Sequence, residues 1–238
     1  QKNVSARLRE GWEFVRADEF PEMEWPSIDS GRYEGVIAVG GLMLARIPEE
    51  IVEQRKDSLA TAISKETGKN YNESIAEVNE ALHMAQFAFG SGRNSHGEAV
   101  SSEVQDKDAY MLRKPKGVIA IVSPFNFPLA IGAYWCAAPA LVEGNTVILK
   151  PSEDAPISTQ LAVQIYEEAG VPAGVINLVH GEGETGDALI REDVDHICFT
   201  GSAEVGQHIR KVAAESWHKT TSCEMGSKSA CIIFDDVE

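Results

Sequence analysis

The feature that most constrains the fold is a regular alternation of short apolar runs with helical segments after Lys116. Strands are expected over residues 118–122, 146–149, 175–179, 196–199, 221–224 and 230–234. Helices are expected over residues 129–141, 158–169, 186–190 and 205–214. Strands that alternate with helices are typical of βαβ units and of a parallel sheet covered on both faces. The pattern therefore predicts a doubly wound, Rossmann-like α/β domain with flanking helices.

The part of the chain before this alternation has a different character. Apolar residues recur at helical spacing after Pro48, and Gly68 is a stop signal for that first helix. A second helix is expected to begin near Asn72. Residues 1–30 are polar and predict loops with short strands, whereas residues 99–114 alternate weakly and predict one exposed strand. An N-terminal helical pair therefore precedes the α/β domain.

Charge and cysteine usage exclude several classes of protein. Asp and Glu number 37 against 21 Lys and Arg, so the formal net charge is −16. Such a surface repels phosphate backbones and anionic lipids, which argues against nucleic-acid and membrane partners. The longest apolar run also falls short of the roughly 18 residues of a membrane span. The four cysteines and six histidines show no metal or disulfide spacing, so we expect no metal site and a cytoplasmic setting.

Three loops follow expected strands, where ligands bind in open parallel sheets. In the first, Lys150-Pro151-Ser152-Glu153, an ammonium and a carboxylate stand side by side and could hydrogen-bond a ribose. A solvated surface ion pair is the alternative interpretation of that spacing. In the second, Gly181-Glu-Gly-Glu-Thr-Gly186, the glycines match GxGxxG and could approach a phosphate. A tight strand-to-helix turn explains the same glycines.

The third loop, Phe199-Thr200-Gly201-Ser202, leads directly into a helix. Free N–H groups at a helix N-terminus form a natural anion site, and Gly201 permits a close backbone approach. The alternative is a plain helix cap, because Ser fills that role routinely.

Four motifs in order carry a family resemblance. They are Ser123-Pro-Phe-Asn-Phe-Pro128, Gly144-Asn-Thr-Val-Ile-Leu-Lys-Pro-Ser-Glu153, Phe199-Thr-Gly-Ser202 and Cys223-Glu-Met-Gly-Ser-Lys228. With their spacing, the segment from about residue 49 to 238 resembles the aldehyde dehydrogenase superfamily. Members of that family use a cysteine nucleophile, NAD(P)⁺ as hydride acceptor and a glutamate base. The resemblance therefore implies oxidation of a small aldehyde to a carboxylic acid.

The resemblance also implies roles for individual residues. The Asn126 amide would be the oxyanion-hole donor, and Glu224 would be the general base. Lys150 and Glu153 would meet the adenosine ribose, and Ser202 would meet the pyrophosphate. Further cofactor contacts are expected from Ser123, Pro124, Phe125, Pro151, Ser152, Gly181, Gly186, Phe199, Thr200, Gly201, Val205, Met225 and Gly226. NAD⁺ is expected to bind better than NADP⁺, because the Glu153 carboxylate would repel a 2′-phosphate.

The resemblance finally implies a division of the chain. Residues 1–226 would form the NAD(P)-binding domain, with residues 99–116 as a strand of an oligomerisation arm, so a homo-oligomer is expected. Residues 227–238 would be the first strand of a largely absent catalytic domain, with the nucleophilic cysteine beyond Glu238. Cys223 adjoins Glu224 on one strand, so its side chain points to the opposite face. The other three cysteines lie in apolar segments, where cysteine usually packs as a small buried hydrophobe.

Two other classes of function remain open from the sequence. One is a nucleotide-binding or assembly module of the same fold without catalysis. The other is a structural protein that binds no ligand, which the joint presence of Lys150, Glu153 and Ser202 argues against. A reading frame that continues into a cysteine-bearing segment would favour the enzyme.

Overall fold

The computed structural model describes residues 49–92, 94 and 97–235, together with four short strands nearer the N-terminus. These strands are β1 (Glu13–Phe14), β2 (Ala38–Val39), β3 (Leu42–Met43) and β4 (Ala45–Arg46). They form two antiparallel pairs, β1 with β4 and β2 with β3. Most of the polar segment 1–30 lies outside the described residues. The chain divides into two compact units, Gln1–Ser58 and Leu59–Glu238.

The expected helical pair is confirmed. Helix α2 (Glu49–Thr67) ends before Gly68, whose φ of 75° is a left-handed conformation that glycine adopts without strain. Helix α3 (Tyr71–Ser91) begins after Asn70, whose side-chain oxygen accepts a hydrogen bond from the Glu73 amide at 3.0 Å. This is an N-cap of the kind that Asn commonly provides.

The second unit is built on a five-stranded parallel sheet, which confirms the predicted α/β fold. Its strands are β7 (Val118–Val122), β8 (Thr146–Lys150), β9 (Ile176–Leu178), β10 (His196–Thr200) and β11 (Thr220–Glu224). Their order across the sheet is β11-β10-β7-β8-β9, and every neighbouring pair is parallel. The chain therefore proceeds from β7 to one edge and then returns to continue on the other side of β7.

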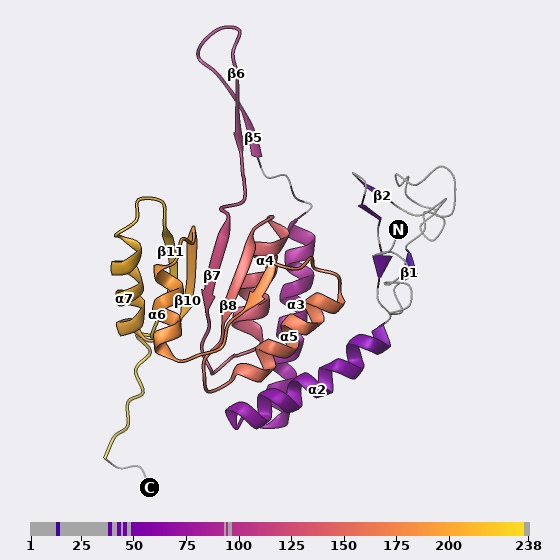
Figure 1. The fold of residues 1–238 in the computed structure, drawn as a ribbon, viewed down its shortest axis with the longest axis vertical. Coiled ribbons are helices and arrows are strands. Elements are labelled where there is room, and N and C mark those ends of the chain that lie inside the picture. The colour runs from indigo at the N-terminus through magenta and orange to yellow at the C-terminus, as the bar shows by residue number, and fades with distance from the viewer. Residues whose placement is uncertain are drawn as a thin grey trace. The chain divides into compact units, whose positions relative to one another are not determined.

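Helices cover both faces of this sheet (Figure 1). One face carries the π-helix η2 (Ala130–Cys136), α4 (Ala137–Val142) and α5 (Pro156–Glu168), and the other carries α6 (Gly183–Arg191) and α7 (Ala203–Ala213). Alternate strand side chains supply the two cores: Ile119 and Ile121 pack toward α4 and α5, whereas Ala120 packs toward α6 and α7. Helix α3 packs against η2 and α4. The helix expected over 129–141 is thus present, with a π-helical first half.

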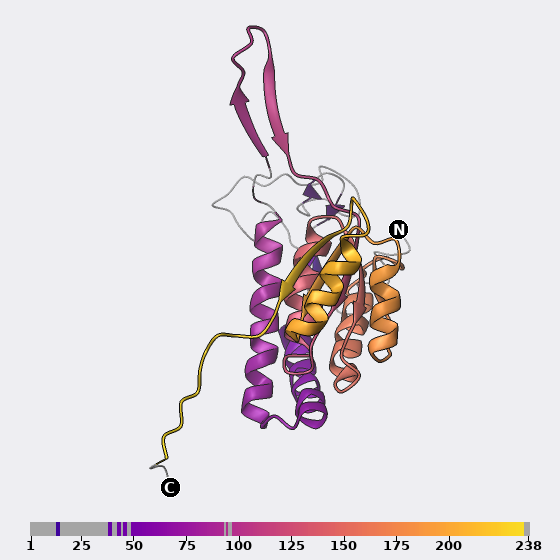
Figure 2. The same ribbon diagram turned by 90° about the vertical axis from the view of Figure 1, so that its left-hand side faces the viewer.

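The exposed segment after α3 is a hairpin rather than one strand. Strands β5 (Gly97–Ser101) and β6 (Asp108–Leu112) pair antiparallel, and the hairpin extends away from the sheet (Figures 1 and 2). The turn places Asp106 at a φ of 64°, a conformation that Asp tolerates better than most residues. The single strand predicted over residues 99–114 is therefore wrong, because that turn reverses the chain within it.

The strand predicted over residues 230–234 is also wrong. Residues 225–234 have no regular structure and run away from the sheet (Figure 2). Ile232 and Phe234 are 74% and 70% exposed, and Cys231 is exposed rather than buried in a strand. An apolar segment forms a strand only where another strand pairs with its backbone, and β11 is the edge strand here. No helix in the described part of the chain is both long and apolar enough to cross a bilayer.

Candidate functional site

The main candidate site is a cavity of about 540 Å³ at the carboxyl edge of the sheet. The strand order reverses between β7 and β10, and such a switch point leaves a crevice where ligands of open α/β sheets bind. The loops after β7, β8 and β10 all reach this crevice, together with one face each of α6 and α7. The topology alone therefore places a ligand site at this edge.

Most of the predicted cofactor residues line this cavity. They are Ser123, Pro124, Phe125, Lys150, Ser152, Glu153, Gly186, Phe199, Thr200, Gly201, Ser202 and Val205. The structure brings these residues together from segments up to 82 positions apart in the chain. Those outside the lining are Pro151, Gly181, Met225 and Gly226.

Lys150 and Glu153 form the polar wall contributed by the end of β8. The Lys150 side chain is buried, and its Nζ donates a hydrogen bond to the Pro151 carbonyl at 2.8 Å. Its Nζ also lies 3.6 Å from Glu153 Oε2, whereas the Glu153 side chain is 49% exposed. The alternative interpretation, a solvated surface ion pair, therefore does not hold for the lysine. The pair presents a fixed ammonium and an accessible carboxylate to the cavity.

Ser202 caps helix α7 at the other side of the cavity. Its Oγ accepts a hydrogen bond from the Val205 amide at 3.3 Å, so the capping interpretation of this serine is confirmed. The cap does not remove the anion-binding character of the site, because a helix N-terminus has several amides without helical partners. Gly201 is closely packed, since a Cβ would lie 2.6 Å from the Phe199 ring and would force the ring to move.

The GxGxxG segment acts mainly as a strand-to-helix turn. Gly181 has a φ of 151°, and a Cβ at this position would lie 2.0 Å from the Thr185 hydroxyl oxygen. Helix α6 begins at Gly183, three residues earlier than the sequence predicts. Of the two glycines of this segment that are predicted to contact cofactor, only Gly186 lines the cavity, and a Cβ there would lie 3.5 Å from the Lys150 side chain.

Several cavity residues escaped the sequence analysis. Asp187 and Ile190 line the cavity from α6, and His208 and Ile209 line it from α7. Together with Gly183 and Val205, which also line the cavity, these residues have the three- or four-residue spacing of one face on each helix, which was the signal available.

Asp187 links the two helices that border this part of the cavity. Arg191 Nε donates to the Asp187 carboxylate at 2.7 Å, and His208 from α7 contacts its other oxygen. The hydrogen bond from Arg191, followed by that from His208, lowers the pKa of Asp187 to about 2. The carboxylate is therefore charged at neutral pH and joins α6 to α7.

The two predicted catalytic side chains stand at the same edge of the sheet. Asn126 lies in the loop after β7, and Glu224 is the last residue of β11. Both residues are exposed, and β10 is the only strand between their two strands. The Gly201 amide donates to the Glu224 carbonyl at 3.1 Å, which joins the end of β11 to the loop after β10.

The cysteines occupy other places in the fold. Cys223 packs with the core under α6 and α7, on the opposite side of β11 from Glu224, as alternation predicts. Cys136, the last residue of η2, lies beside Cys198 under α4, and its hydrogen bond lowers the pKa of Cys198. Cys198 is nevertheless two residues inside β10 and does not line the cavity.

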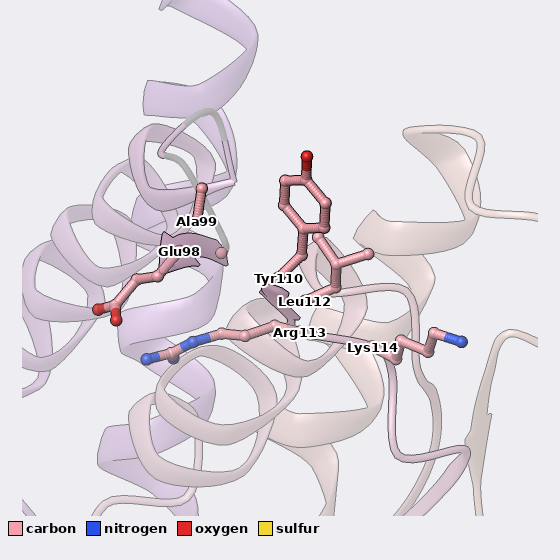
Figure 3. A pocket seen from close by; sticks show the side chains of 7 residues that line it. Glu98, Ala99, Tyr110, Leu112, Arg113 and Lys114 are labelled. Atoms are coloured by element: carbon pink, nitrogen blue, oxygen red, sulfur yellow. The ribbon is translucent and has the colours of Figure 1, made fainter. Parts of the chain in front are cut away.

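A second cavity of about 460 Å³ lies along the β5–β6 hairpin (Figure 3). Tyr110 and Leu112 stand next to each other on one side of β6. Glu98, Arg113 and Lys114 supply its charges, and none of the predicted cofactor residues contributes to it. The sheet-edge cavity therefore remains the candidate site.

The fold and the site define a doubly wound α/β protein with a ligand cavity at its switch point. Comparison with known proteins gives its family: the aldehyde dehydrogenase family pattern matches residues 43–238. The chain belongs to the aldehyde dehydrogenase family. Betaine aldehyde dehydrogenase of Bacillus subtilis is 38% identical over 221 residues, which cover 92% of this chain and 43% of that protein. Alpha-ketoglutaric semialdehyde dehydrogenase of the same organism is 39% identical over 79% of this chain and 39% of its own length.

Solved structures give the same result. Betaine aldehyde dehydrogenase from Staphylococcus aureus, in complex with NAD⁺, superposes with a TM-score of 0.73 at 34% identity, covering 79% of this chain and 37% of that one. An NAD-dependent benzaldehyde dehydrogenase from Corynebacterium glutamicum gives 0.70 at 34% identity, covering 74% and 39%. The chain thus spans about two fifths of the length of these relatives.

Proposed function

We propose that this chain is the cofactor-binding part of an NAD⁺-dependent aldehyde dehydrogenase. The observation that carries the proposal is the convergence of the Lys150–Glu153 pair and the α7 N-terminus on one cavity at the switch point. Structure neighbours whose names state NAD dependence or a complex with NAD⁺ support the choice of cofactor.

The cavity fits a dinucleotide in size and in the chemistry of its walls. Its volume of about 540 Å³ lies within the range of small-molecule sites. The exposed Glu153 carboxylate can accept hydrogen bonds from a ribose diol, and the start of α7 can accommodate a pyrophosphate. Val205 and Ile209 offer an apolar surface to a flat adenine ring. These residues would hold the cofactor, which supplies a hydride acceptor when bound.

The chain's own catalytic contribution would come from Asn126 and Glu224. An amide N–H held beside a developing oxyanion is worth about 3–4 kcal/mol in comparable sites. A carboxylate at Glu224 can take a proton from water and so activate it to hydrolyse a thioester. The nucleophilic thiol is not among the four cysteines described above, so we propose that the 238 residues alone do not turn over aldehyde.

Assembly and location complete the proposal. The β5–β6 hairpin exposes Val100, Tyr110, Met111 and Leu112, which is consistent with an arm that pairs with another copy of the chain. We propose a homo-oligomer in the cytoplasm, with the domain boundary near residue 226. The tail after β11 would pair only within the remainder of the protein.

The deciding experiment measures NADH formation and NAD⁺ binding together. The 238-residue chain should bind NAD⁺ and form no NADH from a panel of aldehydes, whereas the chain joined to a cysteine-bearing continuation should turn over. In the active protein, Asn126→Ala should lower kcat by roughly 10²–10³. Glu224→Gln should stop after a burst of about one NADH per site, since acylation proceeds without deacylation. Steady turnover by the 238 residues that Cys198→Ser or Cys223→Ser abolishes would show that the nucleophile is misplaced.

A further inference from the structure

A buried carboxylate lies directly behind the loop that carries Asn126. Glu77 of α3 is 1% exposed, although Glu is rarely buried unless it is paired. Its Oε1 accepts hydrogen bonds from the backbone amides of Leu129 and Ala130 at 2.9 and 3.2 Å. These amides lie at the start of η2, where helix N–H groups lack partners within the helix.

The other oxygen of the same carboxylate binds Lys69 from the turn between α2 and α3. Lys69 Nζ lies 2.7 Å from Glu77 Oε2 and 3.7 Å from the centroid of the Phe127 ring. The lysine is itself held in place, because the Ser64 hydroxyl donates to its carbonyl at 2.8 Å. One ammonium therefore neutralises the buried carboxylate and contacts the ring of the residue next to Asn126.

A third contact comes from α5. The Thr159 hydroxyl donates a hydrogen bond to the Pro128 carbonyl at 2.7 Å, and both residues are buried. Each of the four residues that follow Asn126 therefore has a contact that holds it in place. Lys69 lies over the Phe127 ring, and the Thr159 hydroxyl binds the Pro128 carbonyl. Glu77 binds the amides of Leu129 and Ala130. Asn126 itself is exposed and directly precedes this anchored segment.

This arrangement exceeds what helix capping requires. A Ser, Thr, Asp or Asn next to the helix would cap η2 locally. Here a carboxylate from another helix is fully buried, which is costly unless every partner is in place. The contacts of Glu77 join the start of η2 to α3, so they restrict the direction in which the loop leaves β7. A donor in an oxyanion hole needs this control, because a 1 Å displacement can cost about 10²-fold in rate.

We propose that Glu77, neutralised by Lys69, is a positioning residue that sets the orientation of the Asn126 amide. The inference rests on the proposed function, since it assumes that Asn126 is the oxyanion donor. Glu77 touches neither substrate nor cofactor in this scheme. It acts only through the loop, so its removal should matter only while Asn126 is present.

The contacts are tested first in the 238-residue chain. In Glu77→Gln, the amides of Leu129 and Ala130 should exchange with deuterium about tenfold faster or more, because a hydrogen bond to a charged acceptor is lost. Glu73→Gln, the same charge change at an exposed position of α3, should leave both exchange rates unaltered. If Glu77→Gln fails to fold, the double variant Lys69→Met/Glu77→Gln is used in its place, because it removes the buried carboxylate charge together with its ammonium partner. Unchanged exchange in the folded variant overturns the inference.

The role is tested by a double-mutant cycle in the active protein that contains this chain. Glu77→Gln should lower kcat by roughly 10- to 100-fold while the Kd of NAD⁺ stays within twofold. In the Asn126→Ala background the same substitution should lower kcat by less than about twofold, because the group it positions is gone. An equal loss of rate in both backgrounds would show a general structural role and overturn the inference alone. An Asn126→Ala protein of full activity would overturn the proposed function and this inference together.

Discussion

Replacing Glu153 by Gln should reduce the preference for NAD⁺ over NADP⁺, because the substitution removes one charge and keeps the shape. The Glu153 side chain is about half exposed at the cavity wall, 3.6 Å from the Lys150 ammonium. Its carboxylate would accept the ribose hydroxyls of NAD⁺ and would lie beside the 2′-phosphate of NADP⁺. Loss of the Glu153 charge should therefore weaken the binding of NAD⁺ and strengthen the binding of NADP⁺.

The magnitude follows from the exposure of the side chain. Two unit charges about 4 Å apart repel by about 1 kcal/mol in water and about 4 kcal/mol near a protein surface. Half exposure favours the lower part of this range, about 1–2 kcal/mol, or roughly 5- to 30-fold in affinity for NADP⁺. Loss of charge-assisted hydrogen bonds should weaken NAD⁺ by a similar factor. The ratio of the Kd of NADP⁺ to the Kd of NAD⁺ should therefore fall by at least about tenfold.

The assay is a calorimetric titration of each cofactor into wild type, Glu153→Gln and Asp154→Asn. Asp154 is the matched control, because it is an exposed carboxylate one residue away that does not line the cavity. The wild-type preference should also shrink at high salt, since exposed charges are screened. Tighter binding of NADP⁺ by wild type, or a Kd ratio that Glu153→Gln leaves unaltered, would refute the reasoning.

Three further outcomes are expected. Gly117→Ala should lower the free energy of unfolding by several kcal/mol in urea, because φ is 129° and a Cβ would lie 2.1 Å from the Asp195 carboxylate. Gly174 has a φ of 84° and open space around it, so Gly174→Ala should lower the free energy of unfolding only by the cost of backbone strain, about 1–3 kcal/mol. Equal losses of stability in the two variants would contradict this difference. The Asp187 carboxyl should titrate near pH 2 by NMR, and a midpoint near 4 would contradict the contacts. The hydrogen bonds by which Asp187 joins α6 to α7 are therefore complete above the pKa of an unfolded Asp and are lost only as the pH falls through about 2. Leu112→Glu should reduce self-association in sedimentation experiments, and a wild type that sediments as a monomer at micromolar concentration would rule out the arm.

The local elements were predictable because their signals are local. The run Val118–Val122 is a strand with those bounds, and the helix after Pro48 ends at Gly68 as its stop signal indicates. The hairpin was not predictable in the same way, since no Gly or Pro marks the reversal at Asp106. The apolar run at 230–234 carries a strand pattern, but a pattern cannot supply the neighbouring strand that would pair with it.

The same distinction between local and long-range signals applies to the residues of the candidate site. Residues such as Glu153 and Ser202 were found because they follow strands, and strand ends of a parallel sheet meet at one edge. Asp187 and His208 were missed because their contact depends on how α6 packs beside α7, across 21 positions of sequence. Glu77 gave no signal, since a Glu in a helix usually faces solvent. Its burial depends on two amides 52 and 53 positions away.

The most direct test of the account is to map NAD⁺ binding on the isotope-labelled 238-residue chain by NMR. The cavity at the switch point predicts saturable chemical-shift changes for the amides of residues 150–153 and 199–205, with residues 97–112 of the hairpin unaffected. The same titration should show no NADH after an aldehyde is added. Saturable shifts confined to the hairpin, or no saturable shift at any cofactor concentration up to the millimolar range, would contradict the assignment of this chain as an NAD⁺-binding part of an aldehyde dehydrogenase.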